Sequence, residues 1–250
     1  MKPIVSIITP CYNSEKFISE TIMSIQKQTF EDWELIITDD CSTDSSVDLI
    51  NSFASADNRI KLYCLNTNQG PGVARNNSIN KSNGRYIAFC DSDDQWKPTK
   101  LKKQLEFMKT HKLAFTYASY EIINEDGKLI GKVSSPPNLR FKDMLRNNYV
   151  GCLTAIYDSN IIGKHLMSEI RKRQDWALWL NIFKKIKQTK GMNEKLAIYR
   201  YRSNSISSNK IQMIKHNWIV YNKELNFNKL SSFFLLINFI FFYVKKKIKK

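Results

Sequence analysis

The first part of the chain alternates between short apolar runs and segments of helical character. The runs lie at 4–10, 33–40, 60–65 and 86–90 and are rich in β-branched and aromatic residues. Strands that alternate with helices in this way form βαβ units, in which helices cover both faces of a parallel sheet. The pattern therefore predicts an α/β fold with a mostly parallel sheet. Ser14 is the predicted N-cap of the first helix.

Polar clusters directly follow three of the four predicted strands. They read PCYNS, DDCSTD and DSDD, and they begin at Pro10, Asp39 and Asp91. Because ligands of such sheets bind beyond the carboxyl ends of the strands, we expect the three clusters to converge on one site. Three polar strand ends are also more than turn chemistry requires.

The last cluster sets three carboxylates, Asp91, Asp93 and Asp94, next to one another. Like charges this close repel, so the segment is either a solvated turn or a place where a cation neutralises it. Hard divalent cations prefer oxygen ligands, and Mg²⁺ commonly binds one or two carboxylates together with substrate phosphates. The spacing, its position and the positive charge of the chain together point to a divalent metal (Mg²⁺ or Mn²⁺) and a phosphorylated ligand.

The chain carries a net charge of +16, from 39 basic and 23 acidic residues. This excess indicates an anionic partner, although solubility alone also accounts for it. The basic residues are spread widely and no nucleic-acid-binding motif is evident, so we expect no nucleic-acid partner. There is no GxGxxG after the first strand, no GxxxxGK[ST] and no HExxH, which argues against dinucleotide-binding proteins, P-loop NTPases and zinc hydrolases.

Beyond residue 95 the regular alternation ends. The predicted elements are a helix at 99–111, a strand at 114–124 with an EDGK turn, a helix at 141–148, a strand at 151–158 and a helix at 174–186. Since no long linker separates the two parts, we expect them to share one sheet. A nucleotide-type half at 1–95 is then completed by a second half.

The five cysteines form no C-x-x-C pair and no disulfide framework, which favours a reducing compartment. The apolar part of the first ten residues is too short for a secretory signal and ends at Pro10. We therefore expect a cytoplasmic protein.

The C-terminal tail at 211–250 differs in character from the rest. Its apolar run at 231–244 has 14 residues, which as a helix extends about 21 Å, short of the roughly 30 Å hydrocarbon core of a bilayer. Lysines follow at 245–247 and 249–250, and each favours anionic headgroups by about 1 kcal/mol. The tail is predicted to attach the protein peripherally to an anionic membrane surface. The alternative, a core or dimer-interface helix, leaves a homo-oligomer open.

Three segments, in this order, resemble a known family. VSIITPCYNSEKFISETIMSIQKQTFEDWELIITDDCSTDSS, NQGPGVARNNSI and GRYIAFCDSDDQWKPTKL are similar to the nucleotide-sugar half of the family 2 glycosyltransferases, which have the Rossmann-like GT-A fold. GCLTAIYD, RKRQDWALWLNIFKK and NEKLAIYRYRSNSISSNK resemble the branch that builds bacterial lipopolysaccharide, capsule and teichuronic acid. The resemblance covers about residues 3–210. It implies a GT-A domain at 1–210, with a nucleotide-binding half at 1–95 and an acceptor half at 96–210.

The resemblance implies roles for individual residues of this chain. Pro10 and Tyr12 border the nucleoside, Asp40 accepts a hydrogen bond from the base, and Arg75 lies near the base and ribose. Asp91 faces the ribose and Asp93 ligates the divalent metal. The implied nucleotide-sugar-binding set is Pro10, Tyr12, Asp40, Arg75, Asp91, Ser92 and Asp93, and the implied catalytic base is Asp175 in the QDW segment.

Each assignment has an alternative that the residues alone leave open. In these alternatives Tyr12 packs over a turn, Asp40 caps the next helix and Arg75 pairs with a surface acid. Asp175 is then only a favourable charge in the first turn of a helix. Trp176 and Trp179 are interpreted as core residues. Three further residues are neither included nor excluded: Asp94, and Arg200 and Arg202 in the hydroxyl-rich loop at 199–207.

The reaction implied by the resemblance is a metal-dependent glycosyl transfer that inverts the configuration of the sugar. Asp175 removes the proton of an acceptor hydroxyl, which attacks the anomeric carbon of a nucleotide sugar, by default a UDP sugar. The implied acceptor is a saccharide or lipid-linked saccharide at the inner face of the plasma membrane. The alternative function is a non-catalytic, nucleotide-sugar-binding scaffold in a polysaccharide-assembly complex. The intact QDW and DSD segments argue against that alternative.

Overall fold

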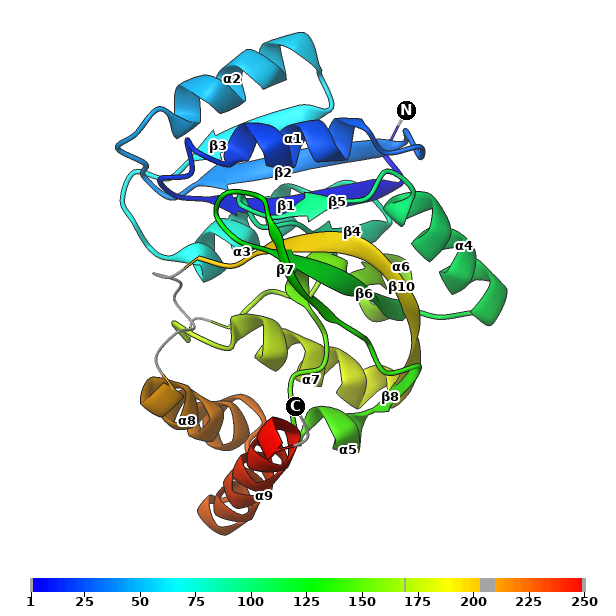
Figure 1. Ribbon diagram of the computed structural model, residues 1–250, viewed down its shortest axis with the longest axis vertical. Coiled ribbons are helices and arrows are strands. Elements are labelled where there is room, and N and C mark those ends of the chain that lie inside the picture. The colour runs from blue at the N-terminus through cyan, green and yellow to red at the C-terminus, as the bar shows by residue number, and fades with distance from the viewer. Residues whose placement is uncertain (1, 169, 203–209, 249–250) are drawn as a thin grey trace.

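The computed structural model describes residues 2–168, 170–202 and 210–248 (Figure 1). Its first part alternates as predicted: β1 (Val5–Cys11), α1 (Ile18–Gln26), β2 (Trp33–Asp39), α2 (Ser46–Ala56), β3 (Ile60–Cys64), α3 (Pro71–Lys81) and β4 (Tyr86–Phe89). β1 lies between β2 and β4, β2 pairs with β3, and all of these pairs are parallel. Every residue of β1 and β2 is buried, as expected for strands covered on both faces.

The second part adds a mixed extension to the same sheet. Its elements are β5 (Gln95–Trp96), α4 (Lys100–His111), β6 (Phe115–Ile123), β7 (Leu129–Val133), β8 (Asn138–Arg140), α5 (Phe141–Met144), the 3₁₀ helix η1 (Cys152–Thr154), β9 (Ile156–Asp158), α6 (Ser159–Ile162), α7 (Gln174–Ile186) and β10 (Gln188–Arg200). The strand order is β3-β2-β1-β4-β9-β6-β10-β5, with β7 beside β6 and β8 beside β10. β9 joins β4 to β6 by antiparallel pairing on both sides, so the sheet runs continuously across residue 95.

Two apolar clusters cover the two faces of this sheet. Because side chains alternate along a strand, neighbouring residues of β1 point to opposite clusters, with Ile7 in one and Ile8 in the other. Helices α1, α2 and α4 cover the first face, and α3 and α7 cover the second. Trp176 and Trp179 of α7 are fully buried in the second cluster, which confirms their interpretation as core residues.

Two predicted elements differ from the structure, and one long strand was not predicted. The helix at 141–148 is confined to α5, and the strand at 151–158 begins with η1 and keeps only three strand residues. No strand was predicted at 188–200, where β10 is 13 residues long. The pairing of β10 with β6 shifts register twice between Met192 and Ala197, so its side chains do not follow the regular alternation from which a strand is predicted.

The predicted N-cap role of Ser14 is wrong. α1 begins at Ile18, and its N-cap position is occupied by Phe17 without a side-chain cap. The hydroxyl of Ser14 instead donates to the carbonyl of Tyr12 at 3.2 Å and lies 2.7 Å from the hydroxyl of Ser92. The Ser14 hydroxyl therefore ties the loop between β1 and α1 to the loop after β4, while the Ser14 carbonyl accepts the backbone N–H of Ile18 at 2.9 Å.

The tail forms α8 (Lys210–Ile219), the π-helix η2 (Val220–Glu224) and α9 (Lys229–Ile248). Along the long axis of the molecule, α8 and α9 lie at the end opposite α2 (Figure 1). None of the helices in the described ranges combines the length and the apolarity needed to cross a membrane. Residues 203–207 of the predicted loop, and Lys249 and Lys250, lie outside the described residues.

Candidate active site

A cleft of about 650 Å³ opens beyond the carboxyl ends of β1, β2 and β4. It is lined by all eight residues that the sequence suggested: Pro10, Tyr12, Asp40, Arg75, Asp91, Ser92, Asp93 and Asp175. A larger cavity, of about 930 Å³, lies between the start of β1 and α4 and contains none of them. The structure thus brings the predicted residues together, and their chemical roles stay predictions.

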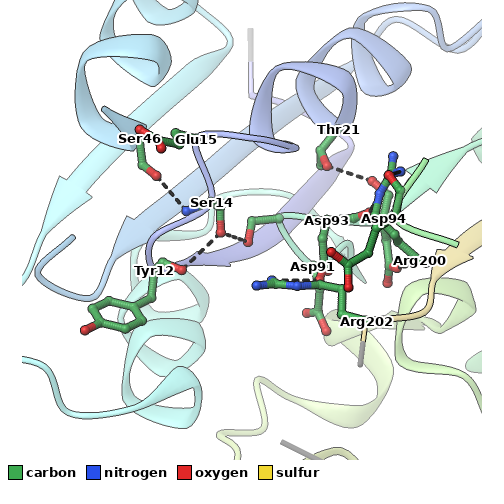
Figure 2. A network of polar contacts seen from close by, with 12 residues as sticks. Tyr12, Ser14, Glu15, Thr21, Ser46, Asp91, Asp93, Asp94, Arg200 and Arg202 are labelled. Atoms are coloured by element: carbon green, nitrogen blue, oxygen red, sulfur yellow. Dashed lines mark hydrogen bonds and ion pairs between the residues drawn. The ribbon is translucent and has the colours of Figure 1, made fainter. Parts of the chain in front are cut away.

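Tyr12 stands at the mouth of the cleft. Its side chain is 47% exposed, and Figure 2 shows its ring directed away from the polar network around Ser14. Ser14 is held from two sides, because its N–H donates to the hydroxyl of Ser46 at 2.7 Å and its own hydroxyl contacts Ser92. Tyr12 is therefore a free aromatic face on a fixed loop, an arrangement suited to packing against a planar base.

Asp40 follows β2 and lies beside the segment that carries Tyr12, since its backbone N–H donates to the carbonyl of Cys11 at 2.8 Å. It is buried, and its two carboxylate oxygens accept the backbone N–H groups of Gln69 and Gly70, both at 2.7 Å. Gly70 is the N-cap of α3 and has a φ of +91°, a conformation that favours glycine. Asp40 does not cap α2, whose N-cap is Ser45. It instead positions the loop that leads into α3.

Arg75 of α3 lies against Asp91 after β4. Its Nη2 donates to Asp91 Oδ1 at 2.6 Å, so its partner is another residue of the cleft rather than a surface acid. The guanidinium is almost fully buried, and its Nε has no hydrogen-bond partner among the described atoms. The pair joins α3, the helix of the third βα unit, to the end of the fourth strand.

The acidic segment after β4 contains two kinds of aspartate (Figure 2). Asp93 is partly exposed in the cleft and pairs with Arg202 at 3.3 Å, and burial together with the charge of Asp91 raises its pKa. Asp94 is 2% exposed, and its Oδ1 accepts the backbone N–H of Arg200 at 3.0 Å. Burial raises the pKa of Asp94 well above its ordinary value. Asp93 faces the ligand space, whereas Asp94 holds the loop in place.

Arg200, at the end of β10, holds the same loop from the other side. Its side chain is 2% exposed, and its Nε donates to the carbonyl of Asp93 at 3.1 Å. Nη1 donates to the carbonyl of Glu125 at 3.0 Å, and Nη2 pairs with Glu20 at 2.5 Å. Since these donors are engaged within the protein, Arg200 is a positioning residue, while Arg202 lies beside Asp93 in the cleft.

The residues of the cleft fit one particular mode of binding a divalent metal. Among the described residues, no group of three or more His, Cys, Asp or Glu side chains is arranged to hold a metal ion. Asp93, with Asp91 next to it, offers the one or two carboxylates that Mg²⁺ uses when substrate phosphates supply further oxygens. The site therefore suits a metal that binds together with a phosphorylated ligand, not a metal held by protein groups alone.

Asp175 lies in the first turn of α7 and enters the cleft from the second half of the chain. Its Oδ2 accepts a hydrogen bond from Asn148 Nδ2 at 2.8 Å. The preceding residue, Gln174, packs on α3, where a Cβ added to Gly72 would lie 2.2 Å from Gln174 Nε2. Sequence reasoning missed Asn148, since 27 residues separate the pair and no local pattern links them.

A basic segment, Arg171–Arg173, lies beside Asp175 along the cleft. Arg171 is exposed there. Arg173 turns outward: its Nε donates to Asn217 Oδ1 at 3.0 Å, and its guanidinium lies over the rings of Trp176 and Phe239 at 5.4 and 5.6 Å. The cleft edge is thereby connected to α8 and α9.

Comparison with known proteins identifies relatives along the whole chain. The family described as glycosyl transferase family 2 matches residues 6–170. The chain is 43% identical over 252 residues to a Bacillus subtilis (strain 168) protein named as the teichuronic acid biosynthesis glycosyltransferase TuaG, covering 100% of this chain and 98% of that one. It is 36% identical over 245 residues to the Escherichia coli UDP-Glc:alpha-D-GlcNAc-diphosphoundecaprenol beta-1,3-glucosyltransferase WfgD, covering 97% and 94%.

Solved structures share the fold. S. aureus TarS in complex with UDP-GlcNAc has a TM-score of 0.74 at 21% identity, with 96% of this chain and 72% of that chain covered. The Pyrobaculum calidifontis mannosyltransferase PcManGT, in complex with GDP-Man and Mn²⁺, has a TM-score of 0.64 at 14% identity, with 92% and 66% covered. The predicted GT-A architecture is confirmed. With the family match and relatives aligned along nearly their full length, the chain belongs to glycosyl transferase family 2 and is a glycosyltransferase.

Proposed function

We propose that this glycosyltransferase inverts the configuration of a sugar while transferring it from a nucleotide sugar, by default a UDP sugar, to a hydroxyl of a lipid-linked saccharide. The product is part of a bacterial surface polysaccharide. The names of two relatives support this proposal. The name of TuaG includes teichuronic acid biosynthesis, and the name of WfgD includes a UDP-glucose donor and a diphosphoundecaprenol acceptor. We place the reaction at the cytoplasmic surface of the membrane, where such an acceptor would be carried.

A single observation carries the proposal. The cleft that receives Tyr12, Asp40 and Asp93 from the strand ends and Arg75 from α3 also receives Asp175 from α7. One cavity therefore contains groups suited to bind a nucleoside, groups suited to bind a metal together with a diphosphate, and a group suited to accept a proton. A protein that only bound nucleotide sugars would have no need of the last of these.

Asp175 acts as the general base in this proposal. Asn148 occupies its Oδ2, which fixes the plane of the carboxylate and leaves Oδ1 for the acceptor hydroxyl. The proton moves to Asp175 as the acceptor oxygen bonds to the anomeric carbon, on the face opposite the departing nucleoside diphosphate. The bond from that carbon to the diphosphate oxygen breaks with its electron pair on the diphosphate, so no protein nucleophile is needed.

The donor is held by residues of the first half. Tyr12 packs on the base, Asp40 accepts from it, and the Arg75–Asp91 pair meets the ribose. Asp93 holds a Mg²⁺ or Mn²⁺ ion, which when bound offsets the negative charge of the diphosphate. Arg202 lies beside Asp93 and supplies a second positive charge there.

Two variants and one control test the proposal. We expect Asp175→Asn to bind the UDP sugar with metal as the wild type does but to lose transfer, because the base is absent. Asp93→Ala should lose the metal-dependent part of donor binding. Asp48→Asn is the matched control, since Asp48 is likewise in the first turn of a helix but lies outside the cleft. Titration calorimetry measures binding, and radiolabelled sugar transfer measures turnover.

The outcomes separate the proposal from its alternative. Normal transfer by Asp175→Asn would remove that residue from the mechanism. Donor binding without transfer or donor hydrolysis in the wild type would instead indicate a nucleotide-sugar-binding scaffold. An equal loss of activity in Asp48→Asn would mean that the effect of Asp175 is only that of a helix charge.

A further inference from the structure

Helix α9 presents an apolar face to the outside of the molecule. Its outward side chains are 38–67% exposed, and they are Leu230, Phe233, Phe234, Ile237, Ile240 and Phe241. Their spacing of three and four residues puts them on one side of the helix, which we call the outer face of α9. Six large apolar side chains side by side are more than the scattered ones that protein surfaces ordinarily expose.

The opposite side of α9 is packed on the body of the protein. Ser232 and Phe239 are buried, and the ring of Phe239 lies 5.6 Å from that of Trp176 in α7. The guanidinium of Arg173, at the edge of the cleft, lies over the same Phe239 ring. The helix is thus a docked element with two different faces, and the exposure of its outer face does not come from a detached tail.

The charge around the outer face identifies its partner. No acidic residue follows Glu224 in the sequence, whereas Lys229 precedes the apolar face and lysines at 245–247 and 249–250 follow it. A second copy of the chain is a poor match, because it would bring another net charge of +16 to the interface. An anionic lipid surface accepts both the apolar side chains and the lysines.

We propose that the outer face of α9 lies in the interface of an anionic membrane, with the helix axis parallel to the bilayer plane. Its inner face keeps hold of α7 through Phe239 and Trp176, so the membrane-bound helix sets the position of the helix that carries Asp175. The link between the membrane-bound helix and the reaction at Asp175 rests on the proposed function, whereas the membrane contact does not.

The test uses the full chain and sedimentation with lipid vesicles. We expect binding to vesicles of phosphatidylglycerol and phosphatidylcholine, and a loss of at least about tenfold in the Phe234→Glu/Phe241→Glu variant. Both side chains are 61% exposed, so the variant should keep its thermal midpoint. Ile161→Glu is the matched control, because Ile161 is 63% exposed but belongs to α6. It should bind vesicles as the wild type does.

Other outcomes overturn the proposal. The proposal is wrong if the wild-type protein sediments neither with these vesicles nor with vesicles of phosphatidylcholine alone. It is also wrong if the Phe234→Glu/Phe241→Glu variant binds vesicles as well as the wild type does. A dimer in light scattering that the variant converts to monomer, with no vesicle binding in either protein, would assign the face to a second copy. Calorimetry with a UDP sugar, run on the same samples, shows whether the proposed donor site fails separately.

Discussion

The two halves of the sheet place their site residues in different ways. In the first half, Tyr12, Asp40 and the segment from Asp91 to Asp93 lie just after β1, β2 and β4, whose parallel pairing brings them to one edge, and Arg75 reaches the same edge from α3. In the second half, Asp175, Asn148 and Arg202 come from a helix start, a loop and the segment that follows β10. The first-half side of the cleft is therefore assembled largely by repetition, and the second-half side by contacts between distant segments.

The largest expected effect tests whether the distant contacts hold the halves together. Arg200→Ala removes the donors to two backbone carbonyls and to Glu20, and should lower the free energy of unfolding by about 3 kcal/mol. Its counterpart is Arg59→Ala, whose partner Asp57 is only two residues away and whose side chain is 35% exposed. That change should cost about 1 kcal/mol. Urea unfolding measures both, and equal costs would contradict the comparison.

A smaller effect is expected at Asn148, the partner of the proposed base Asp175. Asn148→Ala should lower kcat about tenfold to hundredfold, part of what a positioned base supplies, and leave the KM for the donor unchanged. Asn147→Ala is the neighbouring control. A change in donor KM without a change in kcat would assign Asn148 to binding.

The junction of the halves contains a buried cation. Lys100 of α4 is fully buried over the ring of Trp96, at 3.7 Å, and its Nζ has no hydrogen-bond partner among the described atoms. Burial lowers its pKa from 10.5 to about 7, against a small opposing contribution from Cys90. Between these values only the unfolded chain binds the proton, so the free energy of unfolding should rise with pH across that window.

Lys100→Met should remove this rise and stabilise the protein at neutral pH by about 1–2 kcal/mol, since the lost cation–π contact offsets part of the gain. Denaturant unfolding between pH 7 and pH 10 measures the slope. Lys102→Met, two residues away on the same helix, provides the control. An unchanged slope in Lys100→Met would show that Lys100 is not the group that titrates.

The smallest effect is expected where the halves touch without polar contact. Gly72→Ala places a methyl group against Gln174, and so should shift the start of α7 and lower transfer a few-fold. Donor binding through Arg75 should change little, and the gain in helix propensity of about 0.5–1 kcal/mol should keep the protein stable. Paired measurements of transfer and donor affinity are needed. Loss of donor affinity alone would place the disturbance in α3 rather than α7.

The same contrast explains what could be predicted from the sequence. The first-half elements and the convergence of the polar strand ends were accessible, because a regular βα pattern and a polar strand end are local signals. The assignment of the seven candidate ligand-binding residues, Arg75 in α3 among them, and of Asp175 came from a family resemblance, not from geometry. Ser14 was misassigned because its hydroxyl partner, Ser92, lies 78 residues away.

Asn148 and the roles of Asp94 and Arg200 were out of reach for the same reason. An aspartate that anchors a loop and one that faces a ligand have the same side chain, and adjacent Asp93 and Asp94 differ only in which way the backbone turns them. β10 was missed because its register shifts twice. Contacts between distant segments, such as those 27 residues apart for Asn148 and Asp175 and 106 apart for Asp94 and Arg200, leave no periodic trace in the sequence.

The position of Arg200 has a consequence for synthesis. The loop at Asp93 and Asp94 is held by a residue 106 positions later, at the end of β10, the strand next to the terminal strand β5 of the sheet. A nascent chain emerging from the ribosome therefore completes β1 to β4 long before it contains Arg200, which holds the loop after β4. We expect the nascent chain to bind the proposed nucleotide sugar only after β10 has been translated. Binding would then indicate that the site has finished folding.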